Sequence, residues 1–345
     1  MHVTMLGCPL PIGGANQEAG HTALLWRQAG IDVTVVPTWS IDKTNPWPDR
    51  LRAAGCQIIE SSPDNLQSVP GLAGGIVSGW CNRHVCEAWP TLQSLGCRVV
   101  WSPCMCYWSP HERHAFTQAP PAAVHFQSIY QRGQLTPWLE LHACPRERRW
   151  LIRGAMDLAA FPFRPKPRDR REFYVGRLSR PDRMKWSRQL FPIAASLRKR
   201  RISTELLCMG WTEETNGKCG KAPPWAKTFA PDLMPAQQFL SNCHALLCLN
   251  GGAEENWPRV GLEAMAAGVP IVAERRWGWL EMIEDGVTGL LCDTPIDFTN
   301  ALTRLANDEP FRMSLITNAR AAVERLTEPK QIASQWMQLL QNIKG

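Results

Sequence analysis

Two glutamates flank the start of a helix that is otherwise apolar. In the segment EENWPRVGLEAMAAG (254–268), Glu255 precedes the helix and Glu263 lies within it. Pro258 suits the first helical position and Gly268 suits the left-handed residue that ends a helix. A carboxylate can accept hydrogen bonds from two adjacent hydroxyls. Glu263 has almost no polar neighbours in this segment, so the helix pattern alone does not explain why a glutamate stands there.

The elements that would position these glutamates alternate between strand and helix. This alternation predicts parallel sheets covered by helices on both faces. The expected strands are HVTMLGC, IDVTVVP, CQIIE, GGIVSGW and CRVVWSP in the first half, then REFYVGRL, STELLCMGW, HALLCLN and VPIVAE. A stretch rich in proline and charge, FPFRPKPRDRRE (161–172), suggests an interdomain linker. Ligands of such sheets bind at the carboxyl ends of strands, so a cleft between two domains is the expected site.

The composition indicates the number of domains and the general class of the protein. With 345 residues and 44% hydrophobic content, two domains are favoured over one. No run of about 18 apolar residues predicts a transmembrane helix, and the N-terminus lacks the features of a signal peptide. We therefore interpret the 13 cysteines as reduced thiols of a cytoplasmic protein.

The formal net charge is +7, and basic residues cluster in three segments. These segments are RERRWLIR (146–153), RPKPRDRR (164–171) and RKRR (198–201). They can be read as solvated helix faces and a linker. They can also be read as an attraction for an anionic partner, such as a membrane surface, a nucleic acid or a phosphorylated ligand.

Five ordered motifs give the chain a family resemblance. They are IGGANQEAGHTALLWRQAGIDVTVV, IRGAMDLAAFPF, FYVGRLSRPDRMKW, GAEENWPRVGLEAMAAGVPIVA and EMIEDGVTGLLC. Together they resemble the nucleotide-sugar glycosyltransferases of the GT-B fold, in particular the retaining group often called family 4. The resemblance is dense from 150 to 293 and thin from 40 to 145.

The resemblance implies an α/β architecture with two doubly wound, Rossmann-like domains that face each other across a cleft. We expect an N-terminal acceptor-binding domain over 1–160 and a C-terminal nucleotide-sugar-binding domain over 161–325. A last helix within 326–345 would pack back onto the N-terminal domain.

The resemblance also implies roles for individual residues. Arg177 and Lys185 would be the cations that stabilise a diphosphate leaving group. Glu263 would accept the ribose hydroxyls, and Glu255 would orient the transferred sugar and the developing oxocarbenium ion. The amides at the start of the helix, and the glycines of the first and third motifs, would approach the donor. The residues in this last group are Val260, Gly261, Leu262, Gly13, Gly14 and Gly176.

Two departures from the family pattern leave alternatives open. Two extra residues precede Lys185, so Arg180 or Arg183 could take its place. Where relatives place a histidine near the sugar, this chain has Cys104-Met105-Cys106, with His111 and His114 a few residues later.

The same region contains possible zinc ligands. They are Cys81, His84, Cys86, Cys104, Cys106, His111 and His114. Their spacing matches no common zinc module, and free cysteines are often core residues, so we predict no metal site.

The sequence thus predicts a retaining glycosyltransferase that transfers a sugar, most readily from a UDP-sugar, to a hydroxyl of a glycan or a lipid-linked sugar. No cofactor and no catalytic metal are expected. The alternatives are transfer to hydroxylated bases of DNA, and a non-catalytic GT-B protein that binds a nucleotide. A cytoplasmic location is expected, with peripheral membrane attachment through the basic segments left open.

Overall fold

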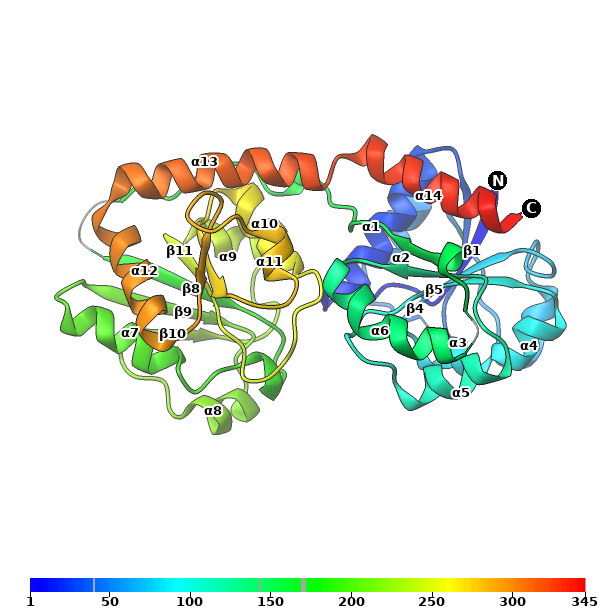
Figure 1. Cartoon of the computed structure of the whole chain (residues 1–345), viewed down its shortest axis with the longest axis horizontal. Helices are drawn as coiled ribbons and strands as arrows, with labels where there is room; N and C mark the ends of the chain where they lie inside the picture. Colours follow the sequence, from blue (N-terminus) through cyan, green and yellow to red (C-terminus); the bar gives the residue numbers. More distant parts are fainter. Residues whose placement is uncertain (40, 143, 169–171, 345) are drawn as a thin grey trace. The chain divides into compact units, whose positions relative to one another are not determined.

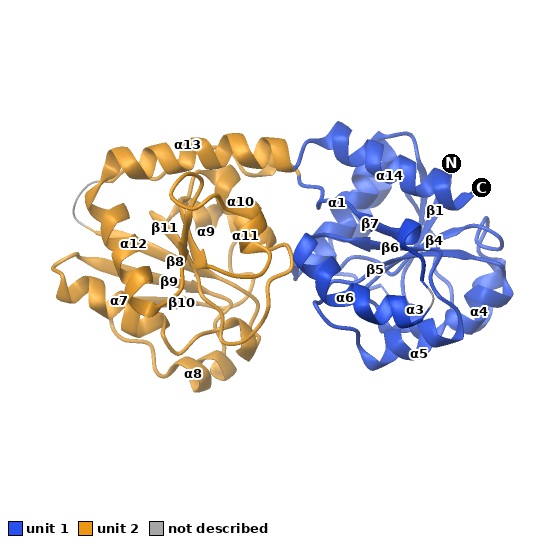
Figure 2. Ribbon diagram, viewed as in Figure 1, with its two compact units in different colours: residues 1–156, 327–345 blue, residues 157–326 orange. Residues whose placement is uncertain are grey.

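The computed structural model describes residues 1–39, 41–142, 144–168 and 172–344. The chain forms two compact units (Figure 2). Unit 1 contains residues 1–156 and 327–345, and unit 2 contains residues 157–326.

Unit 1 is built on a parallel sheet of seven strands in the order β3-β2-β1-β4-β5-β6-β7 (Figure 1). The strands are short apolar runs, which suits a sheet buried on both faces. Their bounds are β1 His2–Leu6, β2 Asp32–Val36, β3 Gln57–Ile58, β4 Ile76–Trp80, β5 Arg98–Ser102, β6 Ala123–Phe126 and β7 Arg149–Leu151. The five strands expected in this half are confirmed, whereas β6 and β7 were not predicted.

Helices cover both faces of this sheet and form two hydrophobic cores. Helices α1, α2 and α14 contribute to one core, and α3 to α6 contribute to the other. The bounds are α1 Gly14–Gln28, α2 Trp47–Ala53, α3 Arg83–Glu87, α4 Trp89–Ser94, α5 Pro110–Gln118, α6 Ile129–Leu141 and α14 Pro329–Lys344, with 3-10 turns η1 Pro63–Ser68 and η2 Arg146–Arg148.

The last helix of the chain, α14, belongs to unit 1 and lies against α1 (Figure 1). Its Trp336 is 1% exposed and meets the ring of His125 at 4.5 Å and the ring of Trp26 at 5.0 Å between centroids. Aromatic side chains bury large apolar areas, so Trp336 anchors the end of the chain in the core of unit 1.

Unit 2 contains a second parallel sheet, of six strands in the order β10-β9-β8-β11-β12-β13. Their bounds are β8 Phe173–Leu178, β9 Thr204–Met209, β10 Ala226–Phe229, β11 Ala245–Cys248, β12 Ile271–Glu274 and β13 Leu290–Cys292. The four strands expected here are confirmed, and the two edge strands β10 and β13 are additional.

The helices of unit 2 form two layers. Helices α7 and α12 pack together, and α10 packs with α9 and α13. The bounds are α7 Leu190–Lys199, α8 Glu213–Cys219, α9 Ala236–Ser241, α10 Arg259–Ala267, α11 Trp279–Met282, α12 Pro295–Asn307 and α13 Glu309–Leu326, with 3-10 turns η3 Leu158–Ala160 and η4 Arg183–Lys185.

The stretch predicted as a linker is part of unit 2 as far as it is described. The Arg164 amide donates to the carbonyl of Ala267 at 3.2 Å, and the Lys166 carbonyl accepts from Arg312 at 3.0 Å. Prolines keep this stretch extended without helix or strand, but its carbonyls and amides are paired with α10 and α13. Residues 169–171 lie outside the described residues.

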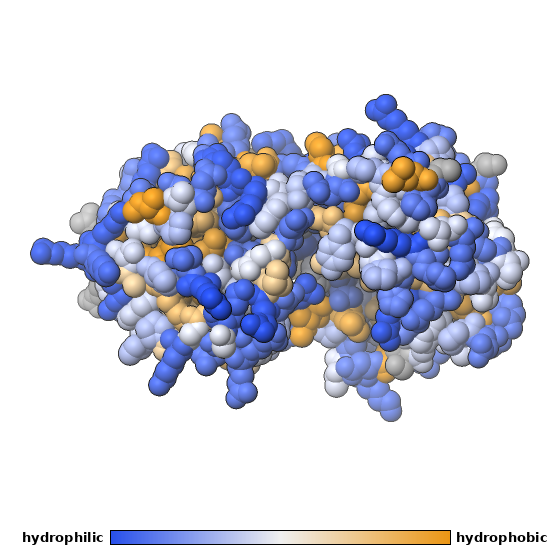
Figure 3. Space-filling model, turned by 60° about the horizontal axis from the view of Figure 1, so that its bottom comes forward, coloured by the Kyte–Doolittle hydropathy of each residue, from blue (hydrophilic) through white to orange (hydrophobic). Residues whose placement is uncertain are grey.

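The surface is mostly hydrophilic on the face in Figure 3, with small separate apolar groups. Within the described ranges, no helix combines the length and the hydropathy needed to cross a bilayer.

Candidate functional site

Arg177 lies in β8, next to the point where the strand order of unit 2 reverses between β8 and β11. The residue is only 2% exposed. Its guanidinium donates to Oδ1 of Asn250 at 2.9 Å and to the main-chain carbonyl of Lys185. Its Nε atom has no hydrogen-bond partner among the described residues. The side chain of Arg177 is therefore fixed beside the point where the strand order reverses, with one buried N–H group unpaired.

Lys185, and not Arg180 or Arg183, meets the predicted sugar-orienting glutamate. The Nζ atom of Lys185 donates to Oε1 of Glu255 at 2.9 Å. Arg180 instead lies 3.8 Å from Asp182, and Arg183 is exposed. Lys185 is the last residue of the 3-10 turn η4, which Asp182 caps by accepting from the Met184 amide.

Asn250 connects these charged groups, and the sequence reasoning missed it. It follows β11, and its Nδ2 atom donates to Oε1 of Glu255 at 2.9 Å while its Oδ1 accepts from Arg177. The main-chain amide of Asn250 donates to Oε2 of Glu274 at 3.0 Å. A polar residue directly after a buried strand was the available signal, because the carboxyl ends of parallel strands share one edge.

Glu274 is the last residue of β12 and was also missed. It is 3% exposed, and burial raises the pKa of its carboxyl, although the Asn250 amide and Arg276 act in the opposite direction. Arg276 pairs with its Oε1 at 2.7 Å. Glu274 therefore acts as a fixed acceptor that orients Asn250 beneath Glu255.

The loop that carries Glu255 is held from the other side by the segment EMIEDGVTGLLC and its neighbours. The Gly278 amide donates to the Glu255 carbonyl at 2.8 Å. Just before it, Arg275 pairs with Asp285 at 2.6 Å and with Asp293 at 3.1 Å. The motif itself contributes Asp285, which holds Arg275, whereas the contact with the Glu255 backbone comes from Gly278 just before the motif.

Helix α10 begins one residue later than expected. Pro258 has φ −70° and ψ 108°, so it caps the helix from outside, and the helix proper starts at Arg259. A proline cap offers no side-chain hydrogen bond, so the Val260 amide is not taken by a capping side chain. Leu262 is fully buried. Gly268, at φ 82°, ends the helix in the left-handed conformation as predicted.

Two glycines predicted to bind the donor are required for packing, and their role toward the donor stays a prediction. A Cβ atom on Gly261 would lie 2.5 Å from the sulfur of Met282, and the Gly261 amide already donates to the Pro258 carbonyl at 2.9 Å. A Cβ atom on Gly176 would lie 2.4 Å from the sulfur of Cys243. Glycine is required at both positions because helices α11 and α9 approach the backbone closely.

Glu263 lies one turn into α10 and is partly buried. Burial raises the pKa of its carboxyl, and the positive charge of Arg259 only partly opposes this shift. No hydrogen bond to this carboxylate is found among the described residues. A carboxylate with unused acceptors at the start of a helix fits a ligand that brings hydroxyl donors.

In unit 1, the predicted glycine loop follows the inner strand β1. Gly13 has φ 102°, a conformation that favours glycine, and Gly14 is the first residue of α1. His111, the alternative to the missing histidine, is exposed in α5. This geometry fits a tight turn from strand to helix. The predicted contact of Gly13 and Gly14 with the donor stays a prediction.

The possible zinc ligands of unit 1 do not assemble. His84 pairs with Glu87 at 3.0 Å, Cys86 is buried in the hydrophobic core, and Cys104 forms a hydrogen bond with Cys81. Over the part of the chain that the structure describes, no three metal-binding side chains come together.

Several arginines of the basic segments form contacts within the protein. Arg149 pairs with Glu140 at 2.9 Å, Arg198 donates to the Thr204 carbonyl at 2.8 Å, and Arg200 donates to Thr303 at 3.0 Å. The part of the second segment at 169–171 lies outside the described residues. Of these three arginines only Arg149 has a carboxylate partner, so Arg198 and Arg200 keep their positive charge.

Comparison with known proteins gives a family match for unit 2 and a structural match for the whole chain. Residues 163–322, nearly all of unit 2, match the family model described as glycosyl transferases group 1. The crystal structure of Anabaena HepE in complex with UDP-glucose superposes with a TM-score of 0.78 at 15% identity, covering 99% of this chain and 100% of that one. The chain has the GT-B glycosyltransferase fold.

Curated relatives match this GT-B chain only over short segments. The putative glycosyltransferase YtcC of Bacillus subtilis is 39% identical over 71 residues, which are 20% of this chain and 17% of that protein. The human alpha-1,3/1,6-mannosyltransferase ALG2 is 30% identical over 101 residues, 29% of this chain and 24% of that protein. The chain thus spans less than a quarter of the length of either relative, and the fold rests on the full-length structural match.

Proposed function

We propose that this chain is a retaining glycosyltransferase that uses a nucleotide-diphosphate sugar, with UDP as the preferred nucleotide. The observation that carries the proposal is the network of Arg177, Asn250, Lys185 and Glu255 in the unit that matches the family model. The choice of UDP is supported by HepE, whose structure contains UDP-glucose.

The diphosphate would be held by cations and amides of unit 2. Lys185 has three N–H donors, of which one reaches Glu255. Arg177 has a buried Nε–H without a partner among the described residues. The Val260 amide, at the positive end of α10, would add a main-chain donor. Because these groups already supply positive charge, we propose that the leaving group needs no metal.

The two glutamates would hold the sugars of the donor. Glu263 would accept both ribose hydroxyls, and Glu255 would accept hydroxyls of the transferred sugar while Lys185 and Asn250 fix its orientation. In the transfer step the bond from the anomeric carbon to the phosphate oxygen breaks, and its electron pair leaves with the diphosphate. The acceptor hydroxyl then bonds to the same face of that carbon, and its proton passes to the released phosphate oxygen.

The acceptor is proposed to be a hydroxyl of a glycan or of a lipid-linked sugar. The alternative is an acceptor in DNA, for which the positive charge of Arg198 and Arg200 is available while Arg149 is paired with Glu140. If the site bound nucleotides without transferring sugar, the chain would be a non-catalytic binding protein of the same fold.

A thermal-shift panel with UDP, GDP, ADP and dTDP in the presence of a metal chelator tests the donor site. We expect UDP to raise the unfolding midpoint most. Glu255→Gln should then lower sugar transfer or donor hydrolysis roughly a hundredfold, the loss typical of one removed electrostatic contact, while the UDP shift persists. A UDP shift without turnover in the unsubstituted protein would indicate the non-catalytic alternative.

A further inference from the structure

Four cysteines of unit 1 follow three neighbouring strands at one edge of its sheet. Cys8 comes after β1, Cys81 directly after β4, and Cys104 and Cys106 after β5. The strand order β1-β4-β5 makes these strands neighbours, and the carboxyl ends of parallel strands share one edge. Cys81 is exposed and the other three are partly exposed, whereas the remaining cysteines of unit 1 are buried. These four are therefore the cysteines of unit 1 that solvent reaches.

Two of these cysteines, Cys81 and Cys104, are held at the same main-chain carbonyl. The Cys81 amide donates to the Ser102 carbonyl at 3.1 Å, and the Cys104 Sγ atom donates to the same oxygen at 3.6 Å. The pairing of Trp80 with Ser102 sets this register between β4 and β5. Neighbouring strands lie about 4.7–4.9 Å apart, and a disulfide needs about 4.4–6.8 Å between its Cα atoms. The spacing of the two strands therefore suits a bond between the two sulfurs.

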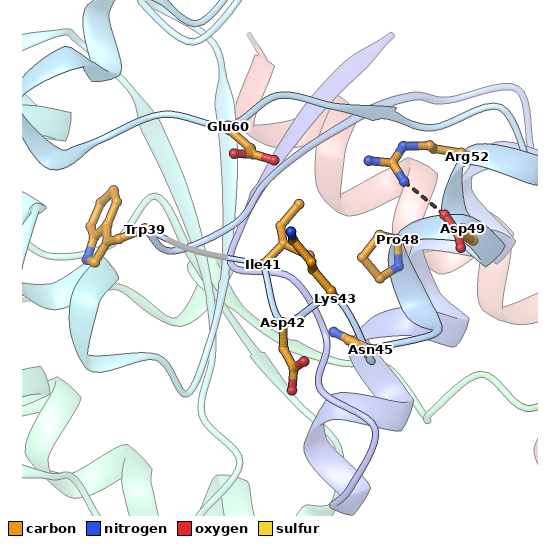
Figure 4. A pocket seen from close by; sticks show the side chains of 9 residues that line it. All are labelled: Trp39, Ile41, Asp42, Lys43, Asn45, Pro48, Asp49, Arg52 and Glu60. Carbon is orange, nitrogen blue, oxygen red and sulfur yellow. Dashed lines mark hydrogen bonds and ion pairs between the residues drawn. The ribbon is translucent and has the colours of Figure 1, made fainter.

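The segment that carries Cys81 is anchored on the side of β2. Asn82 donates to the Thr38 hydroxyl at 3.2 Å and caps α3 by accepting from the His84 amide at 3.0 Å. Figure 4 shows the Trp39 ring turned away from the other labelled side chains, and this ring contacts the His84 ring edge-on at 6.0 Å between centroids. Cys81 itself has a φ of 44°, in the left-handed region that is uncommon for residues other than glycine. Such a backbone persists only where its surroundings determine it, so these contacts fix the place of the Cys81 thiol.

The two thiols differ in their access to solvent. Cys104 packs against a hydrophobic core of unit 1, and its hydrogen bond with Cys81, together with burial, raises the pKa of the Cys104 thiol. A thiol that stays protonated reacts slowly with an oxidant from solution. Cys81 is exposed, so it is the thiol that such an oxidant reaches first.

We propose that Cys81 and Cys104 form a site of reversible oxidation, at which hydrogen peroxide converts the two thiols into a disulfide. The Cys81 sulfur attacks one peroxide oxygen, the O–O bond breaks, and the thiol proton leaves with the other oxygen as water. The Cys104 sulfur then bonds to the Cys81 sulfur of the sulfenic acid. The S–O bond breaks, and the hydroxyl leaves with the Cys104 proton as a second water. The peroxide gains two electrons and the thiol pair loses two.

The disulfide joins the segments that follow β4 and β5, and so fixes the loop after β5. A dithiol reverses the reaction by exchange, which restores both thiols. The site thus makes the carboxyl edge of unit 1 responsive to peroxide.

Counting thiols in the full chain tests the site. The reduced protein is treated with hydrogen peroxide, unfolded in iodoacetamide and weighed by mass spectrometry. We expect the number of alkylated cysteines to fall from 13 to 11, and dithiothreitol to restore all 13. Cys81→Ser should lose no pair of thiols. Cys104→Ser should retain Cys81 as a sulfenic acid, which dimedone traps.

Cys106→Ser is the matched control, since Cys106 follows the same strand and is also partly exposed. This variant should still lose two thiols. The proposal is overturned if peroxide removes no pair of thiols, if Cys106→Ser abolishes the loss, or if the loss of a pair persists in Cys81→Ser or Cys104→Ser. A disulfide-linked dimer in place of the internal bond would also overturn it. Because the readout is a count of thiols, the result does not depend on the donor site proposed for unit 2.

Discussion

Mild acid should destabilise both units, because each contains a histidine that burial holds in the neutral form. In unit 1, Nε2 of His125 lies 2.9 Å from the Ile152 carbonyl and donates to it, so Nδ1 must accept from the Ser102 hydroxyl, also at 2.9 Å. Burial lowers the pKa of His125 to about 4. A proton on Nδ1 would reverse the hydrogen bond with Ser102 and place a positive charge in the core, and burial opposes that charge.

In unit 2, Nδ1 of His244 accepts from the Tyr174 amide at 2.9 Å, and Nε2 donates to the Pro167 carbonyl at 3.0 Å. Burial lowers the pKa of His244 to about 4 as well. Both ring nitrogens are again occupied, so the neutral form is the one that fits the folded state.

The sign of the pH effect follows from these lowered values. An unfolded histidine takes up a proton below about pH 6.5, whereas the folded one stays neutral down to about pH 4. The stability that each histidine contributes is therefore complete above pH 6.5. It is lost as the pH falls toward 4, at about 1.4 kcal/mol per pH unit. Between pH 7 and pH 5 we expect a loss of about 2 kcal/mol in each unit.

The loss of stability as the pH falls should be clearer in unit 1 than in unit 2. Burial raises the pKa of Glu263 and of Glu274 in unit 2, so these carboxyls bind protons more readily in the folded state and add stability as the pH falls. This gain offsets part of the loss from His244. The unit 1 transition should therefore show the full dependence on His125.

Urea unfolding at pH 7, 6 and 5, followed by tryptophan fluorescence, measures this effect. His125→Gln keeps a donor for the Ile152 carbonyl but cannot titrate, so the variant should be less stable at pH 7 and lose most of the pH dependence of unit 1. Equal stability of the unsubstituted protein at pH 7 and pH 5, or an unchanged slope in His125→Gln, would refute this reasoning.

Two further substitutions test the packing of each unit. Trp336→Ala should lower the free energy of unfolding of unit 1 by about 3–5 kcal/mol, because it empties a buried ring site, and exposed Lys330→Ala on the same helix should change it by less than about 0.5 kcal/mol. A small effect of Trp336→Ala in denaturant titrations would show that α14 is not anchored as described. Gly176→Ala should cost unit 2 about 1–3 kcal/mol, since its Cβ would lie 2.4 Å from the Cys243 sulfur, but should leave the UDP affinity of the folded protein unchanged. A loss of UDP affinity without a loss of stability would return Gly176 to the donor site.

Much of the fold could be predicted because its signals are local. The end of helix α10 can be predicted from the sequence, since Gly268 adopts the left-handed conformation that stops the helix. The long strands were visible as apolar runs between helices. The strand β7 was hidden because it lies inside the basic run 146–153, where Arg149 is satisfied by Glu140 and by the Cys144 carbonyl rather than by water.

The candidate site was predicted in part. The family pattern led to Arg177, Lys185, Glu255 and Glu263, but it could not identify what fixes them. Asn250 joins Arg177 of β8, 73 residues earlier, to Glu274 of β12, and contacts between separate strands leave no periodic signal. The glycines at 176 and 261 show the same limit, because a glycine needed for helix packing has the same letter as one needed for ligand approach.

The most direct test of the account is isothermal titration of UDP and of uridine in the presence of a metal chelator. We expect UDP to bind and uridine to bind at least tenfold more weakly. Lys185→Met should weaken UDP binding by about 10- to 100-fold without affecting uridine, as expected for a lost charge-assisted hydrogen bond. Arg183→Met, on the exposed side of the same turn, should bind UDP normally. UDP binding that requires an added metal ion, or that depends on Arg183 rather than Lys185, would contradict the metal-free diphosphate site that we propose for unit 2.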